Sequence, residues 1–422
     1  MAINKVKGTY DVLPNESYLW QALEQKIRDI LGLYNMKEMR TPIMEYSDVF
    51  HRHTELSDMV TKETYDFDDR GERKLTLRPE GTAGIIRSYV ENKLYVSQEL
   101  EKVYYIGPNF RYERPQKGRY RQFYQFGVEA IGTISPALDA EMIILAYDFI
   151  KRIGLKGVRV RINSLGDETS RVSYQEALRN YFLPHVDELC DDCKVRLNKN
   201  PLRILDCKVD HKHPAVKNAP TPQDFLNVES RIYFKQVLEH LNAAKISYEI
   251  APKLVRGLDY YSHTVFEIEA DIEGFGAQNA LGGGGRYQNL VSELGGPDLG
   301  GIGFAFGMER LLLALEAENV EFAQEKTLDA FVIVINDELK TTATSILYEL
   351  RLAGLIADMN FTQKGFKGQL KQALRSNSKY LIILGEDEYQ KGLVAIKNTK
   401  TEVQEEVLIL KIKKYLLEKL EK

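Results

Sequence analysis

Cysteine, long apolar runs and net charge are all scarce in this chain of 422 residues. Three cysteines cannot form a disulfide framework in a chain of this length and are typical of a reducing compartment. No apolar run approaches the about 20 residues that a membrane helix needs, and the amino-terminal segment lacks the apolar core of a secretion signal. The formal net charge is only −4, so nucleic-acid binding would depend on local basic patches. We therefore expect a cytoplasmic protein without a membrane partner.

The rest of the composition is typical of a globular protein with several hydrophobic cores. Hydrophobic residues make up 44% of the chain and charged residues 28%. The length corresponds to about three domains of roughly 150 residues, and no repeat indicates a solenoid. Apolar spacing predicts helices at 20–34, 139–152 and 308–316, strands at 103–110, 122–131, 157–166, 254–269, 280–294 and 300–307, and a mainly helical stretch at 167–247.

From residue 329 onward, predicted strands alternate with predicted helices. The strands are expected at 330–335, 355–360, 380–385 and 393–397, and the helices at 338–353, 366–376 and 407–420. Such alternation is typical of a small α/β domain with a mostly parallel sheet. Residues 316–327 are predicted to link this domain to the rest of the chain.

The most informative segment covers residues 104–132, where two alternating apolar strands flank a loop rich in basic residues, proline and glycine. This pattern predicts a β-hairpin. One hairpin carries five cations, which are Arg111, Arg114, Lys117, Arg119 and Arg121. So many charged side chains are not expected in a hydrophobic core, whereas a polyphosphate or the end of an RNA would bind them.

This segment resembles motif 2 of the class II aminoacyl-tRNA synthetases, in the form typical of the histidyl-tRNA synthetase family. Further blocks resemble the same family in the expected order: KGTYDVLP at 7–14, TLRPEGT at 76–82, LVRGLDYY at 254–261, GGGGRYQNLV at 282–291 and GIGFAFGMERL at 301–311. The resemblance implies an α/β fold: a catalytic domain with an antiparallel sheet flanked by helices (1–166 and 249–325), a helical insertion (167–248) and a carboxy-terminal α/β anticodon-binding domain (329–422).

The resemblance also implies chemistry, namely the activation of an amino acid by ATP with Mg²⁺. Positioned cations stabilise the charge that develops on phosphate oxygens, and the planar guanidinium of arginine suits this task. By resemblance the three catalytic cations are Arg111, Arg256 and Arg310. The residues that would bind ATP are Arg111, Glu113, Arg119, Phe123, Gln125 and Arg310, with the Phe123 ring against adenine.

Histidine as the substrate makes demands of its own. Its ammonium group needs a carboxylate, and its imidazole needs a hydrogen-bond partner at each ring nitrogen. By resemblance, Glu80, Thr82 and Gln125 hold the amino end. Glu129 and Tyr261 contact the imidazole, supported by Tyr260 and Tyr287. A site that pairs both ring nitrogens rejects other amino acids, because they leave its buried polar groups unpaired.

The third expected partner is tRNA(His). Lys364, Lys367 and Lys371 lie at steps of three and four residues, within a stretch from 361 to 385 that has no acidic residue. Such a basic stripe suits a phosphate backbone. By resemblance, Arg114 and Gln116 in the motif 2 loop approach the acceptor end of the tRNA. A homodimer is expected on resemblance alone.

The three cysteines leave two alternatives open. Cys190 and Cys193 have the spacing of half a zinc site, and Cys207 follows with His211 and His213. The second half, Cys-x3-His-x-His, is not a standard zinc spacing. This favours reduced thiols in a helical insertion over a bound metal.

Two other functions compete with that of a histidine-specific synthetase. A non-catalytic relative of this fold, the regulatory subunit of ATP phosphoribosyltransferase, binds histidine but does not charge tRNA. Such relatives typically lose parts of the LVRGLDYY block and the anticodon domain, both of which this chain retains. A synthetase for another amino acid is opposed by Glu129 with Tyr261, because that pair suits an imidazole and not an apolar side chain.

Overall fold

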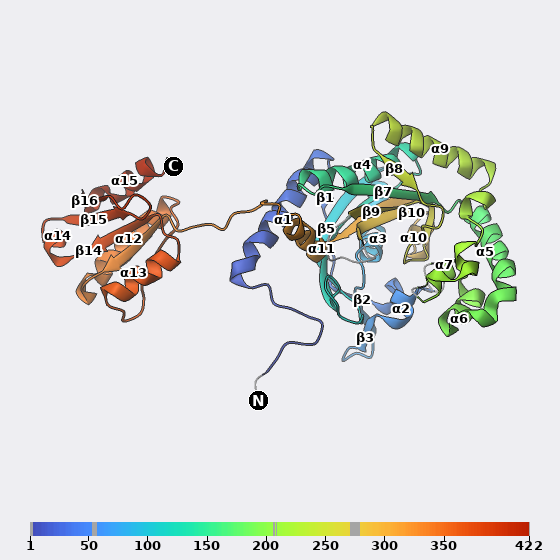
Figure 1. Ribbon diagram of the computed structural model, residues 1–422, viewed down its shortest axis with the longest axis horizontal. Helices are drawn as coiled ribbons and strands as arrows, with labels where there is room; N and C mark the ends of the chain where they lie inside the picture. The colour runs from blue at the N-terminus through green and yellow to red at the C-terminus, as the bar shows by residue number, and fades with distance from the viewer. Residues whose placement is uncertain (1–2, 53–56, 206, 208, 271–278, 422) are drawn as a thin grey trace. The chain divides into compact units, whose positions relative to one another are not determined.

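The computed structural model describes residues 3–52, 57–205, 207, 209–270 and 279–421 (Figure 1). The chain divides into two compact units, residues 1–323 and residues 324–422, each with its own hydrophobic core. Among the described residues no helix combines the length and the apolar character that a membrane span requires.

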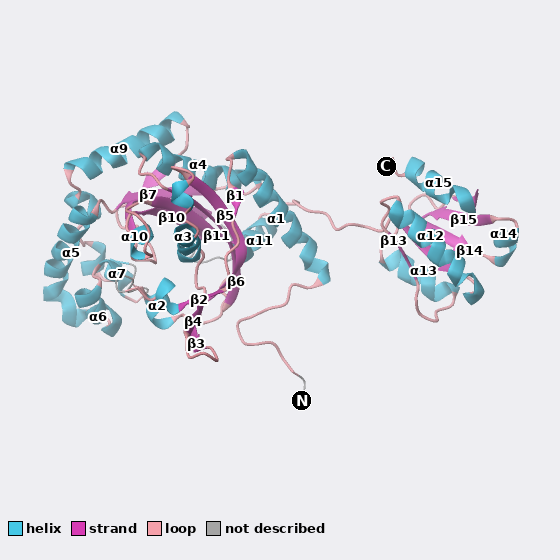
Figure 2. Cartoon of the chain, turned by 180° about the vertical axis from the view of Figure 1, so that it is seen from behind, coloured by secondary structure: helices cyan, strands magenta, loops and turns pink. Residues whose placement is uncertain are grey.

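The first unit is built on an eight-stranded sheet, in which only the two edge pairs are parallel. Its strands, in spatial order, are β1 (Lys37–Glu38), β5 (Glu101–Phe110), β6 (Gln122–Ile131), β11 (Gly301–Gly307), β10 (Ala280–Tyr287), β9 (Tyr261–Ala270), β7 (Val158–Ser164) and β8 (Tyr248–Ile250). The predicted hairpin is confirmed as β5 and β6, with Phe110 opposite Gln122. Four strands from the chain's second half join this hairpin in one curved surface (Figure 2).

Helices cover both faces of this sheet. The main core lies against α1 (Pro14–Leu33), α4 (Pro136–Arg152), α9 (Val228–Ala243) and α11 (Met308–Ala317), and a smaller core lies under α3 (Thr82–Glu91) and α10 (Leu290–Glu293). Helix α1 begins with Pro14, whose fixed φ suits a first helical turn. Its buried residues Leu23, Ile27 and Ile30 recur at helical spacing, and burying each contributes about 1.5–3 kcal/mol.

Shorter elements complete the first unit. A three-stranded sheet contains β2 (Met44–Tyr46), β4 (Lys74–Leu77) and β3 (Tyr65–Asp68), near η1 (Ser47–Val49), α2 (Asp58–Lys62) and η2 (Leu94–Val96). Between β7 and α9 the chain is helical, with α5 (Glu168–Phe182), η3 (Leu183–Glu188), α6 (Asp191–Lys199), α7 (Leu202–Leu205), η4 (Asp210–Lys212), α8 (Pro214–Lys217) and η5 (Pro222–Phe225). This helical segment has a small core of its own, whereas α9 packs beside α4 on the main core.

The second unit is a five-stranded sheet with helices on both faces. Its strands, in spatial order, are β13 (Ala357–Met359), β12 (Ala330–Val334), β14 (Tyr380–Leu384), β15 (Leu393–Asn398) and β16 (Gln404–Leu408), accompanied by η6 (Asp337–Leu339), α12 (Lys340–Leu352), α13 (Phe366–Arg375), α14 (Glu386–Gln390), η7 (Ile409–Lys411) and α15 (Ile412–Lys419). Strand β12 is buried on both faces, which explains its continuous apolar run.

Several predicted elements differ from the structure. The sheet of the second unit is mixed, because β14, β15 and β16 pair antiparallel, so the expectation of a mostly parallel sheet was wrong. Residues 404–408 form the edge strand β16, although 407–420 was predicted to be helical throughout. In the first unit, residues 254–260 are a loop before β9, and β10 ends at Tyr287 before the short helix α10.

Candidate active site

Strand β6 shows how the sequence separates a core face from a functional face. Successive side chains of a strand point to opposite sides. Phe126 and Val128 are fully buried in the main core, while Gln125 and Glu129 lie on the other side of the strand and line a cavity. The alternation that predicted the strand therefore also assigns Gln125 and Glu129 to one face.

That cavity has a volume of about 320 Å³ and lies within the first unit. It collects every residue proposed from the sequence to contact histidine or ATP: Glu80, Thr82, Arg111, Glu113, Arg119, Phe123, Gln125, Glu129, Arg256, Tyr260, Tyr261, Tyr287 and Arg310. These residues come from five separate blocks of the sequence. The fold thus brings together side chains that no local spacing could relate.

One part of the cavity wall is cationic and partly neutralised by two carboxylates. Glu113 accepts a hydrogen bond from Arg119 Nη1 at 3.2 Å and lies 3.9 Å from Arg111 Nη1. Arg256 forms an ion pair with Glu267 of β9. The Arg111 guanidinium also lies over the Phe123 ring, 5.2 Å from its centroid, and its Nε donates to the carbonyl of Pro79 at 2.8 Å.

Arg310 stands in the first turn of α11, where the helix dipole also favours an anion. Its side chain lies against Gly118 of the motif 2 loop, whose φ of +73° favours glycine. Burial lowers the pKa of Arg310, and the neighbouring Arg119 lowers it further. A cation held in this way is stabilised by an incoming anionic ligand.

Next to Arg310, Glu309 ties three segments of the chain together. Its Oε1 accepts hydrogen bonds from the Tyr10 hydroxyl at 2.6 Å and from the backbone N–H of Tyr124 at 2.7 Å. Burial raises the pKa of Glu309 to about 7. This contact fixes the amino-terminal block and β6 against the start of α11.

The second polar centre of the cavity is Glu129, which is only 1% exposed. Its Oε1 accepts from the Thr82 hydroxyl at 2.6 Å, and its Oε2 accepts from the Tyr287 hydroxyl at 2.8 Å. Burial raises the pKa of Glu129 to about 8 against the opposing effect of these two hydrogen bonds. Tyr260 and Tyr261 pack beside it with ring centroids 4.7 Å apart.

Two glycines of β11 provide the space that the side chains of Glu129 and Tyr287 occupy. A Cβ atom on Gly303 would lie 1.9 Å from Glu129 Oε2, and one on Gly301 would lie 2.5–2.6 Å from the Tyr287 ring. The alternating glycines of β11 therefore follow from the bulk of their neighbours on the functional face. On the opposite face of this strand, Phe304 and Phe306 belong to the main core.

Glu80 occupies the amino-terminal end of α3. Its carboxylate accepts from the backbone N–H groups of Thr82 at 2.5 Å and Ala83 at 2.9 Å, so it caps donors that the helix leaves free. An ionised carboxyl group offers about four acceptor positions, which leaves room for a ligand ammonium.

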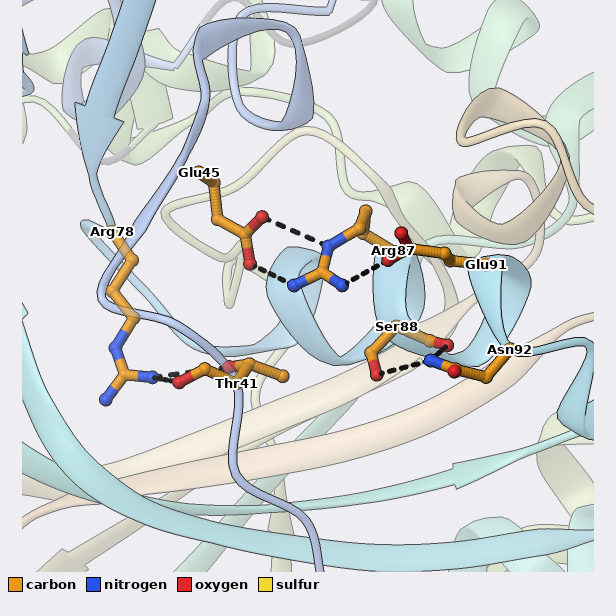
Figure 3. Close-up of polar contacts among 7 residues, drawn as sticks. All are labelled: Thr41, Glu45, Arg78, Arg87, Ser88, Glu91 and Asn92. Atoms are coloured by element: carbon orange, nitrogen blue, oxygen red, sulfur yellow. Dashed lines mark hydrogen bonds and ion pairs between the residues drawn. The ribbon is translucent and has the colours of Figure 1, made fainter. Parts of the chain in front are cut away.

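A buried arginine holds the loop that carries Glu80. Arg78 Nε donates to the carbonyl of Pro108 at 2.8 Å. Its Nη1 reaches the carbonyl and hydroxyl of Thr41 at 3.2 and 3.3 Å (Figure 3). One guanidinium thus joins three strands or loops that are distant in sequence.

A second arginine connects α3 to the small sheet. Arg87 donates through Nε to one oxygen of Glu45 at 3.0 Å, and through Nη2 to the other oxygen. Its Nη1 donates to Glu91 at 2.7 Å (Figure 3). Because Glu45 lies in β2 and is buried, this bidentate pair joins the small sheet to the helix whose first residue is Thr82.

The residues predicted to contact tRNA lie elsewhere. Arg114 and Gln116 are exposed on the motif 2 loop and do not belong to the cavity lining. Lys364, Lys367 and Lys371 are exposed at and along α13 in the second unit. Of the five hairpin cations, only Arg111 and Arg119 line the cavity.

Sequence reasoning missed several residues of the cavity wall, among them Glu267, Glu309 and Tyr105. Glu267 and Glu309 form the contacts described above, and Tyr105 fills the space between Gly81 and Gly127, where a Cβ atom would meet its ring at 2.2–2.3 Å. Glu309 directly precedes Arg310 in the same motif, so its position gave a signal. Glu267 gave none, because an acidic residue in a strand is usually on the solvent face.

Known proteins share both the sequence and the fold of this chain. A model of the histidyl-tRNA synthetase family matches residues 8–311, and a model of the anticodon binding domain matches residues 329–419. The chain belongs to the histidyl-tRNA synthetase family. Curated histidine–tRNA ligases from Acholeplasma laidlawii and Bacillus cytotoxicus are 58% and 50% identical to it, over 96% and 100% of both chains respectively.

The family fold is also present in solved structures. The apo histidyl-tRNA synthetase of S. aureus is 41% identical, and the match covers 98% of this chain and 100% of that one with a TM-score of 0.84. The predicted fold class is confirmed: a large, mainly antiparallel sheet flanked by helices, joined to an anticodon binding domain.

Proposed function

We propose that the chain is a histidine–tRNA ligase, which forms histidyl-adenylate from L-histidine and ATP and then charges tRNA(His). The observation that carries this proposal is the convergence of thirteen residues from five blocks on one cavity. The cavity has a cationic part around Arg111, Arg119 and Arg310 and a buried polar centre at Glu129. These two parts suit a polyphosphate and an imidazole.

The first reaction needs positioning and charge stabilisation. A carboxylate oxygen of histidine attacks the α-phosphorus of ATP, the bond from that phosphorus to the bridging oxygen breaks, and pyrophosphate leaves. We assign Arg111 and Arg256 to the α-phosphate and Arg310 to the γ-phosphate, with Glu113, Arg119, Phe123 and Gln125 completing the nucleotide site. Fixed cations in a cavity act without the reorganisation that water would need.

Selection of histidine would depend on the polar centre. We assign Glu129 and Tyr261 to the imidazole, and Glu80 with Thr82 to the ammonium group. Tyr287 and Thr82 already orient the Glu129 carboxylate from either side. A ligand without ring nitrogens would leave the remaining hydrogen-bonding positions of this buried carboxyl group without a partner, which is costly.

Mg²⁺ fits the same cavity as a companion of ATP. It is usually bound through one or two carboxylates together with substrate phosphates, and Glu113 and Glu267 supply carboxylates to the wall. When bound, the ion would neutralise phosphate charge. The two glutamates also pair with Arg119 and Arg256, so they keep these cations in place before ATP arrives.

The second reaction brings the tRNA to this site. A hydroxyl of its terminal ribose attacks the activated carbonyl carbon and releases AMP. We assign Arg114 and Gln116 to the acceptor end, and Lys364, Lys367 and Lys371 to the anticodon arm. In this assignment residues 1–166 and 249–325 are catalytic, 167–248 form the insertion and 329–422 bind the anticodon. The homodimer and the cytoplasmic location stay predictions.

The regulatory-subunit alternative is not supported. The chain retains Arg111, Arg256 and Arg310 in its cavity, and its second unit matches an anticodon binding domain. Charging of a tRNA(His) transcript with labelled histidine separates the two functions. Stable histidyl-tRNA is expected, whereas histidine binding without any charging would contradict the proposal.

A further inference from the structure

The three cysteines of the chain, which sequence spacing left as reduced thiols, converge on one point of the helical segment. Cys190 precedes α6, Cys193 lies in its first turn, and Cys207 lies between α7 and η4. Together with Asp210, the first residue of η4, they place one ligand atom each within 4.8 Å of the others. Cys193, Cys207 and Asp210 are buried, while Cys190 is partly exposed.

Two distances within this Cys₃Asp cluster are close to those of a tetrahedral metal site. With zinc–sulfur bonds of about 2.3 Å, two thiolates of a tetrahedron lie about 3.8 Å apart. The sulfurs of Cys190 and Cys207 are 3.7 Å apart, and the Cys207 sulfur is 3.7 Å from Asp210 Oδ2. A disulfide would need about 2.05 Å, so the pair is not a covalent bridge.

The surroundings of the cluster orient its ligands. Asp210 Oδ2 accepts from the backbone N–H of Cys190 at 3.0 Å, and the Cys207 sulfur accepts from the backbone N–H of Asp210 at 3.4 Å. Arg196 Nη1 lies 4.0 Å from the Cys193 sulfur, and its charge would offset part of the excess negative charge of three thiolates and a carboxylate. Hydrogen bonds and charged groups that contact the metal-binding side chains in this way are common in metal sites.

The histidines suggested by the sequence are not part of the cluster. His213 accepts a hydrogen bond at Nδ1 from the backbone N–H of Ala215, and its Nε2 lies 3.2 Å from Glu188. Neither His213 nor His211 is among the residues whose ligand atoms converge. The turn of η4 presents Asp210 to the thiols, which is why the Cys-x3-His-x-His spacing was a misleading guide to the ligands.

We propose that Cys190, Cys193, Cys207 and Asp210 bind one structural Zn²⁺ ion. Soft thiolates select zinc over Mg²⁺ or Ca²⁺, and four protein ligands without an open position are typical of structural sites. The ion would join α6 to the segment from Cys207 to η4. The core of this helical segment is small and includes two of the thiols, so a metal link would stabilise it substantially.

The linked segment also contacts the proposed histidine site. Asn200 Nδ2 donates to Asp259 Oδ1 at 2.7 Å, and Arg203 Nη2 donates to the same oxygen at 2.8 Å. Asp259 lies in the loop between Arg256 and Tyr260, both of which line the cavity. The helical segment that the ion would stabilise therefore contacts this loop through Asn200 and Arg203.

The test uses the full chain purified without chelators from zinc-supplemented cells. Elemental analysis should give about one zinc per chain, released when a mercurial reagent blocks the thiols. Replacement by Co²⁺ should produce thiolate-to-cobalt charge-transfer bands together with the intense visible bands of a tetrahedral site. The cobalt spectrum needs no mutation, so it stays decisive even where a variant fails to fold.

Variants then assign the ligands. Cys190→Ser and Asp210→Ala should weaken zinc binding by more than the about 10–100-fold that outer partners of metal ligands cost. His211→Gln and His213→Gln, the matched controls, should keep the full zinc content. Wild-type protein that holds no zinc, shows no cobalt bands or contains a Cys190–Cys207 disulfide by intact mass would overturn the proposal. Loss of zinc in His213→Gln with retention in Asp210→Ala would overturn the ligand set.

Discussion

The cavity of the first unit and the basic face of α13 in the second unit bind anions, on our proposal, in opposite ways. In the cavity, cations from distant segments are half-buried, and Arg111, Arg119 and Arg256 each touch a carboxylate or an aromatic ring. On α13, lysines from one helix are exposed at regular steps. A buried constellation discriminates by geometry and fails when one member is removed, whereas an exposed stripe contributes charge almost additively.

The largest expected effect is on Arg256, whose removal tests whether the cavity acts as a unit. Arg256→Ala should lower the rate of adenylate formation by about 10²–10³-fold, since a fixed donor at the reacting phosphate is removed. Single-turnover adenylate formation measures this rate. Arg256→Lys is the matched control and should recover part of it. An Arg256→Ala variant with normal rates would remove this residue from the mechanism.

A second large effect concerns the ion pair behind the cavity. Asp139 of α4 and Arg286 of β10 are both fully buried and bonded to each other. Asp139→Ala should lower the free energy of unfolding by about 3–5 kcal/mol, because it leaves a buried guanidinium without its counter-charge. Urea unfolding followed by fluorescence of Trp20, the single tryptophan, reports on the first unit alone.

The double variant Asp139→Leu with Arg286→Met serves as the control for that ion pair. Removing both charges should cost less than removing Asp139 alone. Equal decreases in stability in the single and double variants would show that packing, and not charge, dominates at this position.

Glu129 predicts a pH dependence of stability. Its pKa in the folded protein, about 8, exceeds its ordinary value of 4.5, so the folded state holds a proton that the unfolded chain releases as pH rises. Stability should therefore fall as pH rises from about 4.5 to 8. Glu309, with a pKa of about 7, contributes a slope of the same sign up to that pH.

The variant Glu129→Gln isolates this contribution. Between pH 7 and 8 the free energy of unfolding should fall more steeply with pH in the wild type than in the variant. The difference between the two slopes should be up to about 1.4 kcal/mol per pH unit, which corresponds to one proton. Trp20 fluorescence in urea at several pH values gives the two slopes. Parallel slopes would show that Glu129 is already ionised in the folded protein at pH 7.

The smallest effect is expected on α13. Lys367→Ala with Lys371→Ala should weaken tRNA binding severalfold and reduce the slope of its salt dependence by about one unit for each phosphate that is no longer neutralised. Adenylate formation should be unchanged. Lys414→Ala, which removes an exposed lysine of α15 in the same unit, is the control. Binding weakened no more than in the control would remove the basic stripe from the tRNA site.

The features of the first unit differ in how well the sequence could predict them. The hairpin β5–β6 was predictable because its alternation and its loop of proline and glycine are local signals. The convergence of Arg111, Arg256 and Arg310 was predicted from family resemblance alone. These residues are far apart in the sequence, so no local pattern indicates that they lie together. Glu267 was missed because its role depends on which strand faces Arg256.

Other errors have equally physical causes. The last two residues of the short edge strand β16 were predicted to begin a helix, because its partner β15 lies across a tight turn in which Glu402 adopts a φ of +60°. Asp210 was passed over in favour of two histidines, because the direction of a side chain in a short helical turn cannot be derived from spacing. In both cases the structure depends on contacts between residues that are distant in the sequence.

Histidine activation by this chain is tested most directly by ATP–pyrophosphate exchange with each amino acid in turn, with Mg²⁺ omitted as a control. We predict rapid exchange with histidine, negligible exchange with the others, and none without Mg²⁺. A folded protein that binds histidine but exchanges with no amino acid would contradict the claim, as would equal exchange with an apolar amino acid.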